Sequence, residues 1–358
     1  MDWDTLCFNI GTLIAGVFVL DYGADKFIDH TVIVGRRMGI SHTVIALLTA
    51  GAEWEELAVV VAAILQHRSP LALGNVMGST ISNILGAFSL GLLFYPQGLE
   101  FDRSAKIYSA VLFVVTTLFV LLAFFNQLNQ IVGGVLITIF SLYVVSIFYA
   151  IYKGAASPPE LSDSDSDEES SNSDDGESVN HAPYSETSPL IESEQAPLSI
   201  DKGSRRNRGL PYHIFQLILG FISLSLSGYI LSHSAVTIAD TLHLSGTVFG
   251  LTVVSFATTL PEKLVAILSG SRGHGGIMAA TTAGSNVFLL TLCVGVVAAA
   301  GYQVQEADKF VLFELVVVWV SSLVFCAVVF LRLGRNAGVV LLVAYLVFLY
   351  LEFTIYRR

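Results

Sequence analysis

The sequence predicts an all-α membrane protein with ten transmembrane helices in two inverted five-helix repeats. Three observations support this fold class: the composition, the number of long apolar runs, and an internal repeat. Of the 358 residues, 54% are hydrophobic and 13% are charged, whereas a soluble globular protein carries about 25% charged residues. The composition disfavours a soluble enzyme, and the chain has no Ser/His/Asp, Cys/His or phosphate-cradling pattern that would suggest one.

The distribution of charge divides the chain and excludes one class of partner. A net charge of −11 has the wrong sign for binding a phosphate backbone, so no nucleic-acid partner is expected. Most of this charge lies in residues 154–209, which hold 13 acidic and 4 basic residues. That segment has no periodic apolar face and is predicted to be a disordered linker. The three cysteines lie far apart in apolar runs, which argues against a disulfide framework or a zinc site.

Ten apolar runs are long enough to cross a membrane, for which about 20 residues are needed. They lie at residues 6–24, 41–66, 70–94, 106–125, 130–152, 211–236, 246–269, 276–301, 310–332 and 336–356. The first run is not expected to be a cleaved signal peptide, because Asp2 and Asp4 replace the basic start of such a peptide and no small-residue cleavage site follows. The predicted domains are a first repeat at 1–153, a linker at 154–209 and a second repeat at 210–358.

The basic residues of the loops predict the orientation in the membrane. If the linker is cytoplasmic, 13 Lys and Arg residues lie on its side of the membrane and 4 on the other. Such an excess is typical of the cytoplasmic side. Both termini are then expected on the lumenal or extracellular side.

The linker carries two regulatory patterns. Serines alternate with acids in SDSDSDEESSNSDDGES, which suits an acid-directed kinase or forms only a solvated spacer. Glu186, Leu190 and Ile191 fit an acidic dileucine sorting signal, which a sorting adaptor would read. This signal favours a vacuolar or lysosome-like membrane.

A single offset of 206 residues relates two polar segments that lie within apolar runs. Residues 51–84 read GAEWEELAVVVAAILQHRSPLALGNVMGSTISNI, and residues 257–290 read ATTLPEKLVAILSGSRGHGGIMAATTAGSNVFLL. The offset aligns Glu56 with Glu262. Because each half has five spans, the second half enters the membrane from the opposite side. A pseudo-two-fold axis in the membrane plane then brings the two glutamates together near the midplane.

The two aligned glutamates indicate a cation site. A charge at the bilayer centre costs roughly 3 kcal/mol on insertion scales, so Glu56 and Glu262 need a partner. Two carboxylates with Ser and Asn oxygens form the oxygen-only site that calcium prefers. Alternatively, the acids pair with Lys263 or lie at a helix end in water. That alternative has more weight for Glu53 and Glu55, whose counterparts under the offset are Thr259 and Pro261.

The motifs GAEWEEL with GNVMGSTISN, and ATTLPEKL with AGSN, resemble the two alpha-repeats of the cation/calcium exchanger superfamily. The family pattern is G-T-S-x-P-E followed by G-N-x-x-G-S-N, and the repeat cores fall at about 39–95 and 246–301. The resemblance implies that the repeat glutamates bind the transported ions, with help from the G-T-S turn and the Gly-Ser-Asn helix. Matching the motifs by position assigns ion binding to Glu56, Glu262, Ser79, Ser285, Asn83, Asn286, Thr258 and Thr259.

The first repeat departs from the family pattern. Ala52, Glu53 and Glu55 stand where the family has Thr, Ser and Pro, and the loss of the proline is expected to straighten the turn. Glu53 lies one helical turn from Glu56, so the two carboxylates are expected to share one site. Because like charges that close oppose full ionisation, a proton becomes a candidate counter-ion there.

The second repeat also departs from the pattern. Thr281 replaces the usual Asn, and Leu289 stands where an acid or amide is common. Lys263 follows the second glutamate and would repel a bound cation unless it points away or pairs with an acid.

These features together predict an antiporter that exchanges Ca²⁺, or a related divalent cation, for Na⁺ or H⁺. Both ions need the same carboxylates, so each must leave before the other binds, and exchange follows from this competition. Rocking of the mobile helices against the site is expected to give alternating access. The residues leave the counter-ion open. They also leave open a proton-coupled Mg²⁺ or Mn²⁺ carrier, or a membrane scaffold whose exchange site has decayed. No cofactor is expected besides the transported ions, and the other expected partners are the lipid bilayer, the adaptor and the kinase.

Overall fold

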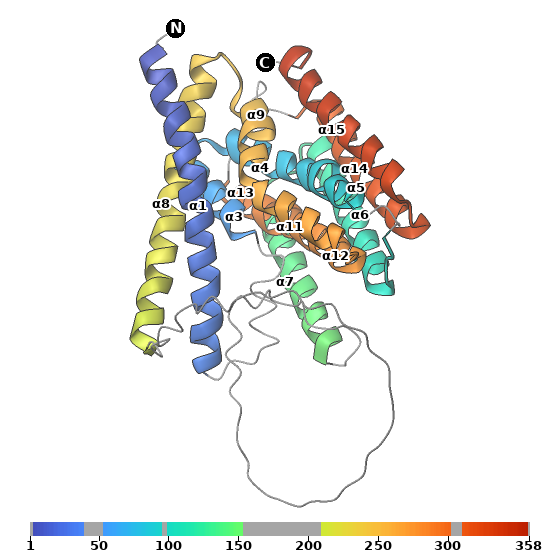
Figure 1. The fold of residues 1–358 in the computed structure, drawn as a ribbon. Coiled ribbons are helices and arrows are strands. Elements are labelled where there is room, and N and C mark those ends of the chain that lie inside the picture. The colour runs from blue at the N-terminus through green and yellow to red at the C-terminus, as the bar shows by residue number, and fades with distance from the viewer. Residues whose placement is uncertain (1–2, 39–52, 95–98, 153–208, 302–309, 357–358) are drawn as a thin grey trace, which may run out of the picture.

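The computed structural model describes residues 3–38, 53–94, 99–152, 209–301 and 310–356, and all regular structure in them is helical (Figure 1). The all-α fold class is therefore confirmed. The first half contains α1 (Trp3–Arg37), α3 (Trp54–Leu65), α4 (Ser69–Ile81), the π-helical segment η1 (Ser82–Phe88), α5 (Ser89–Leu93), α6 (Arg103–Phe124) and α7 (Gln130–Tyr152). The second half contains α8 (Leu210–Thr241), α9 (Gly246–Phe249), η2 (Gly250–Val254), α10 (Ser255–Thr258), α11 (Leu260–Ser271), α12 (Gly275–Phe288), η3 (Leu289–Cys293), α13 (Val294–Ala299), α14 (Leu312–Leu331) and α15 (Arg335–Thr354).

Within the described residues, 8 helices are long and apolar enough to cross a membrane, and a bent pair makes a ninth candidate. Of the predicted span at 41–66, only α3 is described, and the preceding part lies outside the described residues. The first span was predicted too short, since α1 continues from the apolar run through Asp21, Asp25 and Lys26 to Arg37. Acidic and basic side chains end the apolar run without breaking a helix, because they have ordinary helix propensities.

The helices of the two halves correspond to one another under the 206-residue offset found in the sequence. Adding this offset to the bounds of α3 gives the bounds of α11, and the start of α4 likewise gives the start of α12. The equivalent helices α1 and α8 lie side by side and run in opposite directions, as Figure 1 shows. Equivalent helices of opposite direction are the mark of an inverted repeat.

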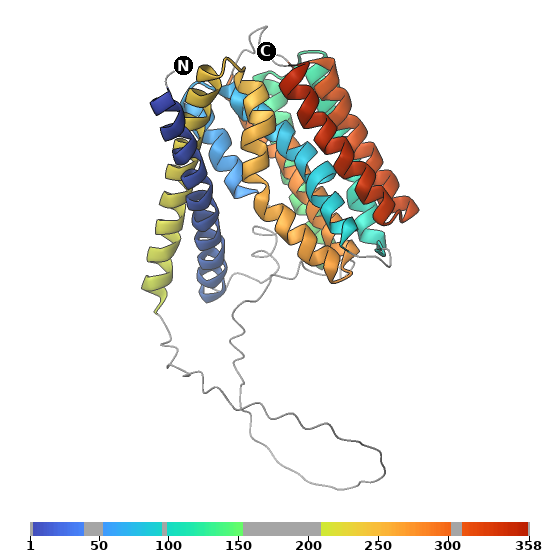
Figure 2. The same ribbon diagram turned by 45° about the horizontal axis from the view of Figure 1, so that its top comes forward.

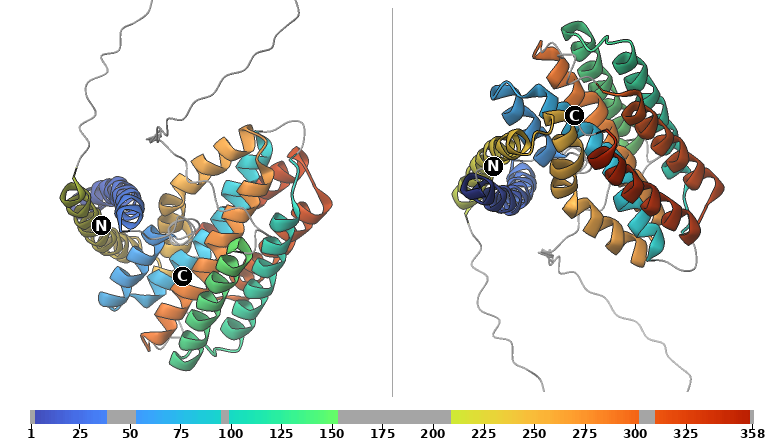
Figure 3. Two further views of the ribbon diagram at one scale, coloured as in Figure 1. Left: turned by 90° about the horizontal axis from the view of Figure 1, so that it is seen from below. Right: turned by 90° about the horizontal axis from the view of Figure 1, so that it is seen from above.

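Helices α1 and α8 form a tightly packed pair. A Cβ atom added at Gly23 would meet the backbone of Leu224, and one added at Gly220 would meet the backbone of Phe27. Glycine at these positions lets the two helix backbones touch. The pair stands beside the other helices rather than among them, in both views of Figure 3.

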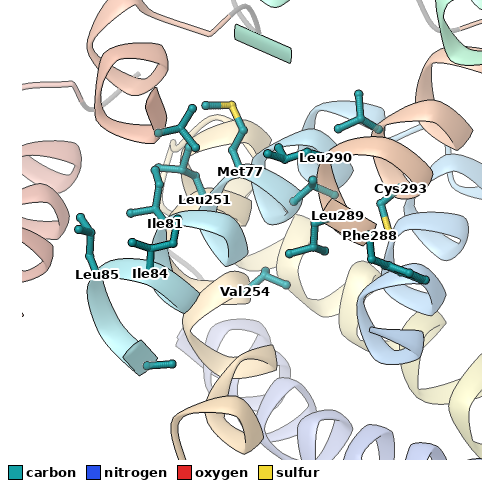
Figure 4. Close-up of a cluster of buried hydrophobic side chains, with 14 of the residues drawn as sticks. Met77, Ile81, Ile84, Leu85, Leu251, Val254, Phe288, Leu289, Leu290 and Cys293 are labelled. Carbon is teal, nitrogen blue, oxygen red and sulfur yellow. The ribbon is translucent and has the colours of Figure 1, made fainter. Parts of the chain in front are cut away.

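The centre of the molecule is built on the spans of α4–α5 and α12–α13. In their most apolar stretches 89% and 78% of the residues are buried, against 44% or less in the other single-helix spans. Figure 4 shows the apolar cluster between them, in which Ile81 and Ile84 lie near Leu251 and Val254. Cys293 is buried in the same cluster as a free thiol.

The span at 246–271 is broken rather than continuous. It bends by 49° between Gly246–Thr258 and Leu260–Ser271, and Figure 2 shows the change of direction. Pro261 explains the break, because proline lacks the backbone N–H and its ring clashes with the carbonyl four residues earlier. The break leaves Thr258 and Thr259, at the C-terminus of α10, buried in the interior of the protein.

The two ends of the chain lie at one end of the molecule. The beginning of α1 and the end of α15 both lie at the top of Figures 1 and 2, whereas the end of α7 and the beginning of α8 lie toward the opposite end in Figure 1. This arrangement agrees with an odd number of spans in each half. The linker and its sorting signal at Glu186, Leu190 and Ile191 lie outside the described residues.

Candidate cation-binding site

Glu56 lies in the first turn of α3, where its side chain is 1% exposed. The helix begins at Trp54, and an acid in a first turn is stabilised by the helix dipole. The Glu56 carboxylate accepts hydrogen bonds from Asn75 Nδ2 and from Ser79 Oγ (2.8 Å), which are both on α4. Thr258 of the second half lies within hydrogen-bonding reach of the same carboxylate. Residues of both repeats therefore meet at Glu56.

Glu262 occupies the equivalent position in the first turn of α11. Its side chain lines a cleft of about 20 Å³ together with Asn83 and Ser285, and that volume is enough for a water-sized particle. Its buried Oε2 atom has no hydrogen-bond donor within the described residues. In the first repeat, Asn75 donates a hydrogen bond to Glu56. The 206-residue offset places Thr281 at the position of Asn75 in the second repeat, so Glu262 lacks an equivalent amide donor.

Glu53 joins the two glutamates into one cluster. Its buried side chain lies within hydrogen-bonding reach of Ser285 and Glu262, and its charge acts on Glu56. A hydrogen bond between two carboxyl groups requires that one of them carry a proton, since an ionised carboxylate only accepts. Glu53 was expected to share a site with Glu56 of its own repeat. In the structure it also lies beside Glu262 of the second repeat.

The two repeats also meet through a pair of amides. Asn83 Nδ2 donates to Asn286 Oδ1 across the halves, at 3.5 Å. Both side chains are buried, and Asn83 Oδ1 and Asn75 Oδ1 have no donor among the described residues. Buried carbonyl oxygens without donors are costly unless something else satisfies them, and a cation does so.

Lys263 does not point away from the cluster, and it forms no direct ion pair with an acid of the described residues. Its ammonium group hydrogen-bonds Ser82 Oγ (2.9 Å), Thr259 Oγ1 and the Thr259 carbonyl oxygen (3.1 Å). Ser82 in turn receives a hydrogen bond from Tyr345 of α15 (3.0 Å). The Thr259 hydroxyl, one of the predicted ligands, is therefore engaged by Lys263.

The structure brings the predicted residues together at the centre of the protein and adds three that the motifs did not assign. Asn75 carried a signal, since it is the Asn of the Gly-Asn motif, but it received no role. Ser82 and Tyr345 gave no signal, because a serine and a tyrosine in apolar runs have many ordinary structural uses. Glu55 lies at the edge of the cluster, where the charges of Asp21 and Asp25 on α1 act on it.

A family model of the sodium/calcium exchanger protein matches residues 8–149 and 212–354, which is more than half of the chain. The chain belongs to the sodium/calcium exchanger protein family. The putative antiporter CaxA of Alkalimonas amylolytica is 26% identical over 359 residues, which cover 96% of this chain and 98% of CaxA. The sodium/calcium exchanger MaX1 of Methanosarcina acetivorans is 26% identical over 376 residues, covering 97% and 99%.

A solved structure of the sodium-calcium exchanger NCX_Mj, soaked with Na⁺ and Sr²⁺, resembles this exchanger with a TM-score of 0.56 at 20% identity. The match covers 96% of this chain and 97% of NCX_Mj, and it shows a shared fold. Family membership confirms the predicted superfamily, a multi-pass membrane protein and cation antiport as the class of function. The family consists of ion exchangers rather than enzymes.

Proposed function

We propose that this exchanger moves Ca²⁺, or a related divalent cation, in exchange for Na⁺ or H⁺ at the cluster of Glu53, Glu56 and Glu262. The observation that carries the proposal is the meeting of Glu56 and Glu262, one from each repeat, at the first turns of α3 and α11. Hydroxyl and amide oxygens from α4 and α12 surround them. Such an oxygen-only set suits a hard cation.

The arrangement supports exchange by competition. A divalent ion between carboxylates and the counter-ions both need the same negative charges, so they bind in turn. Helix α10 ends at the site and helix α11 begins there. Discontinuous helices of this kind supply backbone groups to ions in alternating-access transporters. The names of the relatives MaX1 and NCX_Mj, which are sodium/calcium exchangers, support Ca²⁺ and Na⁺ as the first ions to test.

The proposed function is tested by uptake of radioactive calcium into proteoliposomes that contain the purified protein. An imposed outward Na⁺ gradient and an imposed pH gradient are applied separately, with protein-free liposomes as the control. Uptake under either gradient is the expected result and identifies the counter-ion. Absence of uptake under both, for protein that elutes as a single size-exclusion peak, contradicts calcium exchange and leaves Mg²⁺ and Mn²⁺ to be tested in the same way.

For Glu53 we expect a role in proton coupling. The Glu53→Gln amide donates a permanent hydrogen bond toward Glu262, so the bond that a proton supplies in the wild type no longer depends on pH. The substitution should weaken the pH dependence of calcium exchange more than the affinity for calcium. Exchange rates measured from about pH 6 to 9 at several calcium concentrations separate the two effects. Wild-type pH dependence in this variant would make Glu53 a peripheral acid.

We further propose that the linker faces the cytosol, that both termini are lumenal, and that the protein resides in a vacuolar or lysosome-like membrane. The 13-to-4 distribution of basic residues and the dileucine pattern support this. A tag inserted at Asp165 should be digested by protease added outside sealed vesicles of that membrane.

Replacing both Leu190 and Ile191 by Ala should move the protein to the cell surface. Protection of the tag contradicts the orientation, and unchanged localisation contradicts the sorting signal.

A further inference from the structure

The ammonium group of Lys263 lies in a pocket of oxygen atoms inside the protein. Lys263 is 7% exposed, and Nζ lies 2.9 Å from Ser82 Oγ, 3.1 Å from the Thr259 carbonyl oxygen and 3.5 Å from the Phe256 carbonyl oxygen. The Thr259 hydroxyl is a fourth hydrogen-bonding partner. Within the described residues, the hydrogen-bonding partners of this cation are all neutral oxygens.

The fold provides this pocket through the break before Pro261. Helix α10 ends at Thr258, and the carbonyls of Phe256 and Thr259 lie at the negative end of the helix Gly246–Thr258. The C-terminal end of a helix favours a cation. The ring of Phe256 lies under Nζ, 4.8 Å from its centroid, and adds a cation–π contact. Unwound carbonyls and half-helix C-termini with hydroxyl oxygens are also what coordinates Na⁺ in broken transporter helices.

The aliphatic part of Lys263 lies beside Gly86 and the Tyr345 ring. A Cβ atom added at Gly86 would lie 3.5 Å from Lys263 Cε and 3.4 Å from the Tyr345 ring, which are ordinary van der Waals distances. The charged groups that act on the ammonium are Glu262 beside it on α11 and Glu56 on α3, and the Tyr345 hydroxyl from α15 reaches it through Ser82. The ammonium thus balances part of the charge of the carboxylate cluster, although it forms no ion pair with an acid in the part of the chain that the structure describes.

We infer that the Lys263 ammonium is a tethered monovalent cation, which occupies one cation position beside the carboxylate cluster and keeps that position from transported ions. This inference rests on the proposed cation-exchange function. Three carboxylates at Glu53, Glu56 and Glu262 carry a charge of −3 when all are ionised, and one ammonium reduces this to −2, which is the charge that one divalent ion neutralises. Removing the ammonium while leaving its oxygens should therefore create a position for one further Na⁺.

The test uses Lys263→Ser, which removes the ammonium and opens the oxygen pocket. The melting temperature of the purified protein is measured in detergent over a series of NaCl concentrations, with choline chloride holding the ionic strength constant. A ligand that binds only the folded state raises stability with its concentration. Each tenfold increase in NaCl should therefore raise the melting temperature of Lys263→Ser more than that of the wild type. NH₄Cl should also stabilise the variant beyond the wild type, because the pocket already accepts an ammonium.

Lys106→Ser is the matched control, since Lys106 lies on α6 over the ring of Phe330 and outside the cluster. Its response to NaCl and NH₄Cl should equal that of the wild type. If Lys263→Ser does not give a single size-exclusion peak, Lys263→Gln replaces it, because Gln removes the charge with a smaller change of volume. An equal response to both salts in the wild type and the recovered Lys263 variant overturns the inference.

Adding CaCl₂ to the same measurement separates this inference from the proposed exchange. If Ca²⁺ stabilises the wild type but the Lys263 variant gains no response to Na⁺ or NH₄⁺, calcium binding is supported and the tethered cation is contradicted. If the variant gains the response while Ca²⁺ stabilises neither protein, the tethered cation is supported and calcium as the substrate is contradicted.

Discussion

Glu56→Gln and Glu262→Gln are each expected to abolish calcium exchange while the protein stays folded and inserted in the membrane. An amide keeps the shape of the carboxyl group, and the Glu56→Gln carbonyl oxygen can still accept a hydrogen bond from Ser79. The loss is electrostatic. Two unit charges about 4 Å apart attract by about 4 kcal/mol at an effective dielectric constant of about 20, which corresponds to roughly a thousandfold in affinity.

The measurement is calcium flux per amount of protein that elutes as a single size-exclusion peak. Asp240→Asn is the matched control, because Asp240 is exposed and forms a surface ion pair with Arg68 (3.7 Å), and such pairs contribute little. Glu55→Gln should have a smaller effect than either central variant, since Glu55 lies at the edge of the cluster toward α1. Wild-type flux in Glu56→Gln or in Glu262→Gln would contradict the paired-carboxylate mechanism.

Gly74→Ala is expected to destabilise the whole membrane part of the protein. A Cβ atom at Gly74 would lie 2.9 Å from Thr247 Cα and closer still to the Thr247 carbonyl oxygen, so α4 and α9 would have to move apart. Overpacking lowers the free energy of unfolding by about 1–3 kcal/mol, and a clash with backbone atoms falls at the upper end of this range. The melting temperature should fall on the order of 5 °C or more, and calcium flux should fall with it because α4 carries Asn75 and Ser79.

The same substitution at Gly134 provides the control for Gly74→Ala. Gly134 lies on α7 and has nothing within 4 Å of an added Cβ. Alanine there should leave the melting temperature unchanged or raise it slightly, since Gly inside a helix costs about 0.5–1 kcal/mol relative to Ala. Equal melting temperatures for Gly74→Ala and Gly134→Ala would contradict the close backbone contact.

The sequence was sufficient to predict the repeat and most of the cluster. Polar residues and glycines are scarce inside apolar spans, so a common spacing for Glu56 and Glu262 is a strong signal. The same 206-residue spacing relates the bounds of α3 to those of α11, although the repeats share few identical residues. The extension of α1 to Arg37 was missed because hydropathy marks where a helix stops being apolar and says nothing of where it ends.

The position of Lys263 could not be predicted from the sequence. Its ammonium reaches Ser82 only because α11 starts after a 49° bend and packs against η1. The hydrogen bond from Tyr345 joins residues that are 263 positions apart, with no motif around the tyrosine. Such contacts depend on side-chain direction and helix crossing, which hydrophobic periodicity does not determine.

The packing between the two halves has a consequence for how the chain is held together. The equivalent helices α1 and α8 contact each other, as do the equivalent helices α6 and α14, and the contact of α7 with α13 is repeated by that of α15 with α5. Each half therefore presents the same surfaces to its counterpart, as the subunits of a two-fold homodimer do. The assembly is in effect an isologous dimer within one polypeptide. We therefore expect its cohesion to come from the interface between the halves rather than from the covalent connection between Tyr152 and Leu210.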